Sequence, residues 1–556
     1  MSLQTAYEAY QAGQFDVAET RLAAVLMDQP SDDAAMHLGA MVAMRRGDLR
    51  TALNRIGVAL RSPANSHEKR NVQGNILRAL GADVEAEEAF AASVAADSEY
   101  DVGWRNLASL QAATDKTREA AESYAKLTGL SSDSAPAWTG RIIALIESQQ
   151  LDAADAAIDE ATLPDADRAA LRARLLLYRG ELKRAFAEAK AGLASEAGGT
   201  GSFALALQVL HMIGGWDAAD DFIPNVLAKY GDRAEFWAAA ITARHSAGQT
   251  EEALALYDRA PRTLATKQAR AQIALDQGQF EDAETLAMGA LASQPGYPPL
   301  MHVLALAALG GGKFDLAQNV ADMGLQVRPN DQLYYTVKAS AGRAKGQDYK
   351  FFFDYDRFVK PYDLDPPEGW SSMEAFNTDL KAALDRLHGF KHAPLDQTLR
   401  LGTQTAPDLR YVDSPAIQAF FKAVDPAVRA YLQEIGHDPR HAFLRRNRGG
   451  YRIRSAWSVR LGAGGHHVDH IHPQGWISSA YYVDVPKGDG KAGWIKFGEP
   501  RAPIAKAIGQ GPELDVQPRP GRLVLFPSYL WHGTYPITGD KTRMTLPIDI
   551  LPDIPA

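Results

Sequence analysis

The chain has 556 residues, of which 46% are hydrophobic and 23% are charged, and its formal net charge is −9. This length exceeds what one hydrophobic core usually organises, so we expect two or more domains of ordinary globular composition. The acidic balance argues against a nucleic-acid partner, and the absence of cysteine excludes disulfides, zinc–thiolate sites, iron–sulfur clusters and thiol nucleophiles.

The amino terminus and the apolar stretches predict a protein with no membrane partner. Residues 1 to 8 lack a basic region followed by an apolar run, so we expect no signal peptide. The longest apolar stretch of the helical region, residues 301 to 309, is about half the length needed to span a bilayer. We therefore expect a cytoplasmic location.

The first 347 residues show apolar side chains at helical spacing and a recurring turn signal. The step is 34 residues from 13 to 47, 81, 115 and 149, and again from 278 to 312 and 346, with steps of 30 to 35 between. This period is typical of helix–turn–helix units that stack to bury their apolar faces. The signals are Gly13, Gly47, Gly81, Gly180, Gly215, Gly248, Gly278, Gly312 and Gly346, with weaker copies at Asp115 and Gln149.

Glycine and alanine have separate roles in these units. The glycine is expected to end the first helix in a left-handed conformation that other residues resist. An alanine follows five positions later, where a small side chain lets helices approach, at Ala18, Ala52, Ala86, Ala283 and Ala317. This pattern resembles the tetratricopeptide repeat family over about 340 residues, or roughly ten repeats. The resemblance implies a superhelix whose groove binds a peptide or protein segment; the alternative is a spacer or a dimerisation arm, which would make a homo-oligomer.

The composition changes between residues 349 and 370, where we place the junction between domains. An aromatic run, Phe351 to Phe358, is expected to pack the last repeat onto the next domain. Helical patterns follow at 372–388 and 415–435, with a polar loop at 401–405, and a basic cluster at 439–448 is expected on a solvated face. The predicted domains are residues 1–347, a helical linker at 348–399, and residues 400–556.

After Gly450 the hydrophobic period changes from 3.6 towards 2, which predicts strands. We expect them at residues 453–461, 476–485, 493–497, 522–526 and 543–549. Many short strands broken by glycine and proline favour a sandwich or jelly roll. The predicted fold class is therefore multidomain α + β, with an α-solenoid followed by a strand-rich domain.

Histidines are concentrated in this strand-rich region, at His466, His467, His470, His472 and, about sixty residues later, His532. Neutral imidazoles on one rim can hold a divalent transition metal. Two ligand registers compete. His467 with Asp469 gives the His-x-carboxylate half of a facial triad, whereas His470 with His472 replaces that carboxylate by imidazole. Residue chemistry alone favours the first, because one anionic ligand suits iron(II) better than three neutral ligands.

Two motifs surround these histidines. Residues 470–482 read His-Ile-His-Pro-Gln-Gly-Trp-Ile-Ser-Ser-Ala-Tyr-Tyr, and residues 520–534 read Pro-Gly-Arg-Leu-Val-Leu-Phe-Pro-Ser-Tyr-Leu-Trp-His-Gly-Thr. With Phe-Gly-Glu-Pro at 497–500, they resemble the 2-oxoglutarate/iron(II) oxygenases with a His-x-His-Pro motif, distant relatives of the aspartyl/asparaginyl β-hydroxylases. The resemblance covers about residues 400–550. It implies a double-stranded β-helix, or jelly roll, with flanking helices.

The resemblance also implies a ligand set. His470 and His532 are the expected iron ligands, and His472 occupies the position where many oxygenases have a carboxylate. His467 and Asp469 then become outer-shell or alternative ligands, so the completion of the site stays open between His472 and Asp469.

The co-substrate site is expected on the last strand. Arg543 lies eleven residues after His532, and Thr545 faces the same side of the strand. The resemblance implies that the Arg543 fork and the Thr545 hydroxyl bind the distal carboxylate of 2-oxoglutarate, with Tyr482 beside them. The expected catalytic residues are His470, His532 and Arg543.

Together these features predict an iron(II)- and 2-oxoglutarate-dependent dioxygenase that hydroxylates a protein or peptide side chain recruited by the repeats. One alternative is a small-molecule oxygenase whose repeats serve assembly. The other is a repeat scaffold whose jelly roll has lost turnover.

Overall fold

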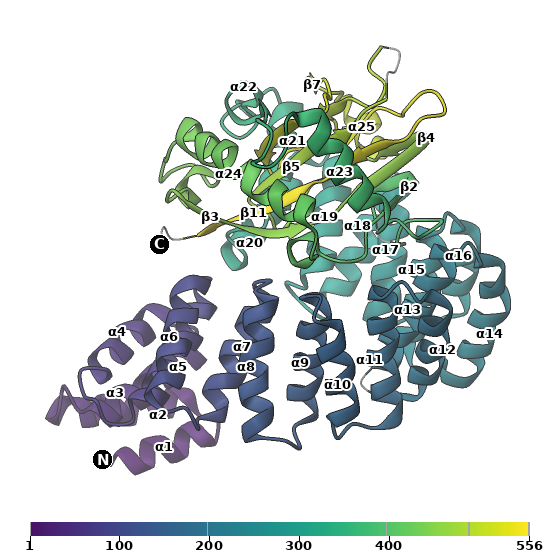
Figure 1. Cartoon of the computed structure of the whole chain (residues 1–556). Coiled ribbons are helices and arrows are strands. Elements are labelled where there is room, and N and C mark those ends of the chain that lie inside the picture. The colour runs from purple at the N-terminus through teal and green to yellow at the C-terminus, as the bar shows by residue number, and fades with distance from the viewer. Residues whose placement is uncertain (1, 197, 396, 487–489, 554–556) are drawn as a thin grey trace. The chain divides into compact units, whose positions relative to one another are not determined.

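The computed structural model describes residues 2–196, 198–395, 397–486 and 490–553, and the chain forms two compact units, Met1–Leu163 and Pro164–Ala556 (Figure 1). The division between units falls inside the helical array. The boundary predicted at residue 347 separates the repeats from the following linker. It is a different kind of division, and it stays a prediction. Among the residues with described coordinates, no helix has both the length and the apolar character needed to cross a bilayer.

The first unit is built from helices that pack in sequence order, each against the next. They are α1 (Leu3–Gln11), α2 (Phe15–Asp28), α3 (Asp33–Arg45), α4 (Leu49–Ala59), α5 (Ser66–Ala79), α6 (Asp83–Ala96), α7 (Asp101–Ala113), α8 (Thr117–Leu130), α9 (Ala135–Glu147) and α10 (Leu151–Glu160).

The same helix pattern opens the second unit. Its helices are α11 (Asp165–Tyr178), α12 (Leu182–Ala191), α13 (Gly199–Met212), α14 (Ala219–Tyr230), α15 (Ala234–Ser246), α16 (Thr250–Arg259), α17 (Leu264–Asp276), α18 (Phe280–Leu291), α19 (Pro298–Gly310), α20 (Phe314–Val327) and α21 (Gln332–Ala344).

A left-handed residue ends the first helix of each pair, as the repeat signal predicts. The glycines at 13, 47, 81, 180, 248, 278, 312 and 346 all have φ between 67° and 86°. One prediction was off by a residue, because Gly214 (φ 70°) takes this conformation in place of Gly215. The weaker copies are also turns: Asp115 and Gln149 both have φ 60°.

Where an alanine lies five positions after the turn residue, that alanine is fully buried. Ala18, Ala52, Ala86, Ala283 and Ala317 are each 0% exposed, as are the equivalent residues Ala120, Ala154, Ala185, Ala219 and Ala253. A larger side chain at these positions would separate the two helices of a pair. The alanine therefore marks the repeat where the glycine is missing.

Replacing Gln149 with glycine is expected to raise the free energy of unfolding by about 0.5–1 kcal/mol. A side chain in the left-handed region costs roughly 1–2 kcal/mol that glycine avoids. The variant loses only a 3.3 Å hydrogen bond from Gln149 Nε2 to the Ile146 carbonyl. Denaturant unfolding of the full chain measures the change.

The matched control is Gly47→Ala at the equivalent turn. A Cβ there meets nothing within 4 Å, so the variant isolates the backbone strain and is expected to destabilise by about 1 kcal/mol. Destabilisation by Gln149→Gly would contradict this account of the turns.

The last repeats share a hydrophobic core with the strand domain. This core contains residues of α17 to α21, of the aromatic run and of the strands. Phe353 stacks on Tyr529 at 6.3 Å between centroids, and the Tyr529 hydroxyl donates to the Phe352 carbonyl at 2.8 Å. The aromatic run therefore packs the last repeat onto the next domain, as predicted.

The strand domain contains the elements α22 (Tyr355–Phe358), β1 (Lys360–Asp363), α23 (Met373–Asp385), β2 (Leu399–Gln404), α24 (Pro415–Ile435), β3 (Gly450–Ala456), β4 (Val459–His467), β5 (Ile477–Asp484), β6 (Ile495–Phe497), α25 (Ala502–Ile508), β7 (Leu514–Val516), β8 (Arg522–Pro527), β9 (His532–Thr534), β10 (Arg543–Thr545) and β11 (Ile548–Asp553). The helices predicted at 372–388 and 415–435 correspond to α23 and α24.

All pairings between these described strands are antiparallel. One sheet has the order β1-β8-β5-β10-β4-β2, with β11 joining β5 to β3, and a smaller sheet has the order β7-β6-β9. The predicted class, a multidomain α + β protein with an α-solenoid followed by a strand-rich domain with flanking helices, is confirmed, and the strands of that domain are antiparallel.

Three local predictions were wrong. The strand expected at 453–461 divides into β3 and β4, and the strand expected at 543–549 divides into β10 and β11. The two breaks lie beside each other, since the Trp457 N–H in the first break donates to the Pro547 carbonyl in the second at 3.3 Å. The polar loop expected at 401–405 largely forms the strand β2, whose bulge at Leu401 (φ 55°) hides the two-residue period.

The basic cluster at 439–448 is only partly solvated. Arg446 donates to the Gly475 carbonyl at 3.2 Å, and burial lowers its pKa to about 10. Arg445 donates to the Pro329 carbonyl at 3.2 Å, at the end of the repeats. Arg445 therefore helps to join the last repeat to the strand domain, and Arg446 bonds within that domain.

His388 is expected to make stability fall as the pH falls from about 6.5 to 4. The ring is buried between Thr403 Oγ1 (2.8 Å) and Ser458 Oγ (3.0 Å), and burial, aided by the charge of Arg460, lowers its pKa to about 4. The unfolded chain then binds a proton that the folded chain does not, and the stability lost is up to about 3 kcal/mol. His388→Gln removes this titration, so its denaturant-unfolding profile should be flatter over that interval; parallel profiles would contradict the assignment.

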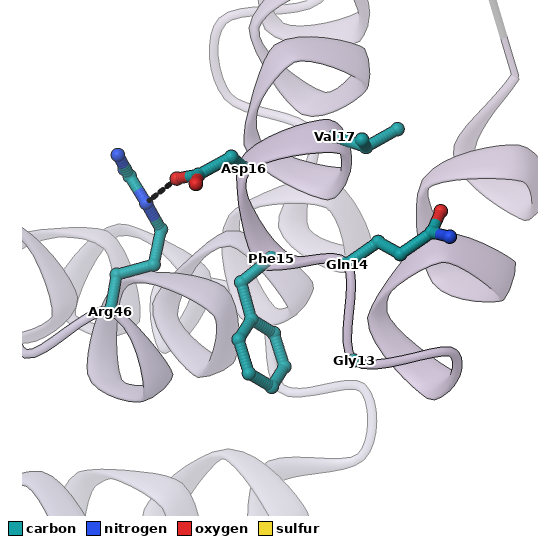
Figure 2. A pocket seen from close by; sticks show the side chains of 6 residues that line it. All are labelled: Gly13, Gln14, Phe15, Asp16, Val17 and Arg46. Atoms are coloured by element: carbon teal, nitrogen blue, oxygen red, sulfur yellow. Dashed lines mark hydrogen bonds and ion pairs between the residues drawn. The ribbon is translucent and has the colours of Figure 1, made fainter.

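A pocket in the first unit lies at the turn between α1 and α2. Figure 2 shows its lining, which consists of Gly13, Gln14, Phe15, Asp16, Val17 and Arg46. Arg46 Nε lies 2.9 Å from Asp16 Oδ1, so these two charges neutralise each other. The pocket coincides with a repeat turn, and we assign it no chemistry.

Candidate metal centre

Three histidines from two distant segments converge in the strand domain. His470 and His472 lie between β4 and β5, and His532 begins β9. His470 and His532 form an antiparallel bridge, with backbone N–H to carbonyl distances of 2.9 and 3.0 Å. One potential ligand atom from each of the three rings lies within 4.8 Å of the others. The backbone bridge therefore fixes the spacing of the two segments.

Each of these rings is oriented through its Nδ1 atom. Nδ1 of His470 lies 2.8 Å from the Val468 carbonyl, and Nδ1 of His532 lies 2.9 Å from the Leu530 carbonyl. Nδ1 of His472 lies 2.8 Å from both carboxylate oxygens of Asp549. Carbonyl and carboxylate oxygens only accept, so each Nδ1 must carry a proton, and in the neutral form of each ring the Nε2 atom keeps a lone pair.

The Nε2 atoms fit a cation. Nε2 of His470 lies 3.3 Å from Nε2 of His472. Two facing lone pairs at this distance repel unless a cation lies between them. Imidazole nitrogens that share one ion at about 2.1 Å lie at about this separation from each other. The donor set is therefore suited to a divalent transition metal such as iron(II).

Burial keeps the rings of His470 and His532 neutral, as metal ligands must be. The pKa of His470 is lowered well below its usual value by burial and by the neighbouring imidazoles. Burial, with a contribution from His472, lowers the pKa of His532 to about 3. Protons therefore compete little for these two ligand atoms at neutral pH.

The competing pair, His467 and Asp469, does not belong to the group of converging ligand atoms. Nδ1 of His467 lies 3.2 Å from Thr398 Oγ1. Oδ2 of Asp469 lies 2.9 Å from Lys496 Nζ, which also pairs with Glu499. Burial, against the effect of Lys496, raises the pKa of Asp469 to about 6. The geometry therefore favours His470 with His472 over His467 with Asp469.

Asp549 is a residue of this site that the sequence reasoning missed. The residue is 9% exposed, and its carboxylate accepts from Ser478 Oγ at 2.8 Å as well as from His472. Burial alone would raise its pKa, but the interaction with His472 and the hydrogen bond from Ser478 outweigh this effect, and the pKa is lowered. The carboxylate lies 77 positions from His472, so no local spacing links the two.

Arg543 carries a buried positive charge with no acidic partner among the described residues. The residue is 3% exposed, its Nη1 donates to the Gly493 carbonyl at 2.6 Å, and its Nε has no partner within the described chain. Burial lowers its pKa. A buried cation of this kind is costly unless an anion binds it. The guanidinium is therefore suited to a carboxylate ligand.

Tyr482 and Thr545 lie beside this guanidinium. Arg543 Cζ lies 5.7 Å from the Tyr482 ring centroid, and Thr545 pairs with Tyr482 across β10 and β5. Burial raises the pKa of Tyr482 to about 12, and its hydroxyl finds no partner among the described atoms. Arg543 also contributes, after burial, to the lowered pKa of His467, which places its charge near the histidine segment.

The aromatic residues around the motifs mostly pack the core. Trp476 donates to the Phe443 carbonyl, Trp531 to Ser340 Oγ, and Tyr481 to Asn377 Oδ1, at 3.0, 3.1 and 2.7 Å. The ring of Trp457, by contrast, lies 6.1 Å from the ring of His472.

Comparisons with known proteins agree with this arrangement. A family model described as "Putative 2OG-Fe(II) oxygenase" matches residues 455–549, and a model described as "Tetratricopeptide repeat" matches residues 274–341. No curated protein matches the chain.

Several solved structures are similar to the chain. A tetratricopeptide repeat protein from Parabacteroides merdae ATCC 43184 is 16% identical, with 50% of this chain and 98% of that chain covered and a TM-score of 0.33. Naa15/Naa10 bound to HypK-THB is 17% identical, with 80% and 72% covered and a TM-score of 0.31. MamA is 17% identical, with 28% and 91% covered and a TM-score of 0.26. Residues 455–549 matched by the first family model include all three converging histidines and Arg543. The chain therefore carries tetratricopeptide repeats followed by a region that matches the "Putative 2OG-Fe(II) oxygenase" family model.

Proposed function

We propose that this chain is an iron(II)- and 2-oxoglutarate-dependent oxygenase that hydroxylates a protein or peptide side chain. The observation that carries the proposal is the set of three imidazoles whose Nδ1 atoms are committed to acceptors and whose ligand atoms lie within 4.8 Å of one another. His470, His472 and His532 would hold the iron. Arg543, with Thr545 and Tyr482, would hold the distal carboxylate of 2-oxoglutarate.

Iron and 2-oxoglutarate, when bound, would supply the oxidising chemistry that turns a C–H bond into C–OH, with oxygen consumed and 2-oxoglutarate converted to succinate and carbon dioxide. The protein contributes position and a dry setting. The Val468 and Leu530 carbonyls and Asp549 hold the ligand rings in one tautomer. Arg543 offers its fork to one end of the dicarboxylic acid, so that the other end is directed towards the histidines.

The repeats support a macromolecular substrate, because stacked helical repeats commonly present extended surfaces for protein segments. The continuous core of the second unit places the last repeats directly against the strand domain. A small-molecule oxygenase and an inactive scaffold are the alternatives that an experiment must separate.

The test measures succinate formed by the purified full chain with iron(II), ascorbate and 2-oxoglutarate. A cell extract is divided by ultrafiltration, and each fraction is added separately. Stimulation by the macromolecular fraction, lost after protease treatment, supports the proposal. Stimulation by the low-mass fraction alone indicates a small-molecule oxygenase. Bound iron and 2-oxoglutarate without succinate under every condition would indicate a scaffold.

A further inference from the structure

The three ligand rings differ in what lies behind them. His470 and His532 each face a neutral backbone carbonyl, at 2.8 and 2.9 Å. His472 faces a carboxylate, whose two oxygens lie 2.8 Å from its Nδ1. The charged partner thus belongs to the histidine at the position where many oxygenases of this kind have a carboxylate ligand.

The carboxylate of Asp549 is held in place from several sides. Ser478 Oγ donates to it at 2.8 Å, and Ser478 is itself hydrogen bonded to Ser528 Oγ at 2.9 Å. Asp549 pairs with Ser478 across β11 and β5, and the register of β11 against β3 shifts directly after it. Bulges of this kind aim a side chain and recur beside active sites. The backbone is therefore shaped to direct Asp549 towards His472.

An N–H donated to a carboxylate makes the opposite nitrogen of an imidazole a stronger donor to a metal, and it transmits part of the negative charge. We propose that Asp549 is a positioning residue that supplies, through His472, the negative charge which a facial triad obtains from a directly bound carboxylate. This inference rests on the proposed metal site. It explains how a set of three neutral imidazoles suits a divalent ion.

The test is a double-mutant cycle read by Co(II) affinity, using the visible absorption of the bound ion in the full chain without co-substrate. Asp549→Asn keeps the shape of the side chain and removes its charge. It is expected to weaken Co(II) binding by about 10- to 100-fold in the native background. In a His472→Asp background the ligand carries its own charge, so the same change is expected to cost nothing.

Equal losses in the two backgrounds would overturn the inference, since a merely structural carboxylate would be needed in both. A second variant, Asp549→Glu, keeps the charge and should retain more affinity than Asp549→Asn; equal impairment would also overturn it. Asp425→Asn is the matched control, because that carboxylate binds Tyr451 and Arg429 and has no link to the histidines. Failure of the native chain to bind Co(II) would instead overturn the metal site itself, and this inference with it.

Discussion

Replacing His532 with alanine is expected to abolish succinate formation and to weaken iron(II) or Co(II) binding by more than about 100-fold. Changes behind a ligand typically cost about 10- to 100-fold in metal affinity, and loss of a ligand should cost more. His532 is 6% exposed, and its ring centroid lies 4.7 Å from that of Phe526, so the substitution also lowers the stability of the fold. Metal titration and thermal unfolding of the same sample separate the two effects.

The matched control for this substitution is His466→Ala. His466 belongs to the same histidine-rich segment, but its Nδ1 faces the Gly464 carbonyl and the residue is outside the converging group. It should bind metal like the native chain. Undiminished metal binding by His532→Ala would contradict the assignment of ligands.

Replacing Arg543 with alanine is expected to weaken 2-oxoglutarate binding by about 30- to 1000-fold while metal affinity stays near its native value. Removing one partner of a buried charge pair costs roughly 2–4 kcal/mol. The protein should remain folded, because the substitution removes a buried cation that has no acidic partner among the described residues. Co-substrate affinity is measured by calorimetry with the metal-loaded chain under nitrogen.

Arg543→Lys tests whether the fork matters beyond its charge, since a lysine ammonium cannot bind a carboxylate in the bidentate manner. We expect it to recover only part of the affinity. Arg460→Ala is the matched control. Arg460 lies on β4 opposite Met544, the residue after Arg543 on β10, but its side chain forms an ion pair with Asp385 at 3.2 Å. Loss of metal binding in Arg543→Ala would show that the two sites have been assigned incorrectly.

The repeats could be predicted from the sequence because every unit has the same local requirement. A chain reversal after a helix needs a left-handed residue, and glycine supplies it at nearly every turn. The signal shifted by one residue at Gly214 and Gly215, where two adjacent glycines are equivalent in sequence. At Asp115 and Gln149 only the 34-residue step, and the alanine five positions later, reveal the turn.

The strand domain was less readable, because its breaks depend on distant partners. Trp457 and Pro547 end their strands where they meet each other, and neither position shows this from its own neighbours. The bulge at Leu401 interrupts the two-residue period of β2, so the sequence predicted a loop there. Two-residue periodicity identifies a strand only where its pairing is regular.

The candidate site divides in the same way. The segment around His470 and His472, the distal His532 and the guanidinium of Arg543 were found from motifs and spacing. The resemblance favoured the register of His470 and His472 but left open whether His472 or Asp469 completes the site. The fold bears on this question, because Asp469 pairs with Lys496. No local pattern pointed to Asp549, because a buried aspartate near the start of a strand has no sequence signature of its own.

The shared core of the second unit has a consequence for how this chain can be divided. Just before His532, the Trp531 indole donates to Ser340 Oγ at 3.1 Å, and the Tyr529 carbonyl accepts from Thr336 Oγ1 at 2.6 Å, both from α21. A fragment that starts after α21 would leave these two groups without their hydrogen-bond partners and would expose the surrounding aromatic side chains to solvent. The strand domain therefore depends on the final helices of the repeats, and a truncated chain should keep these helices together with it.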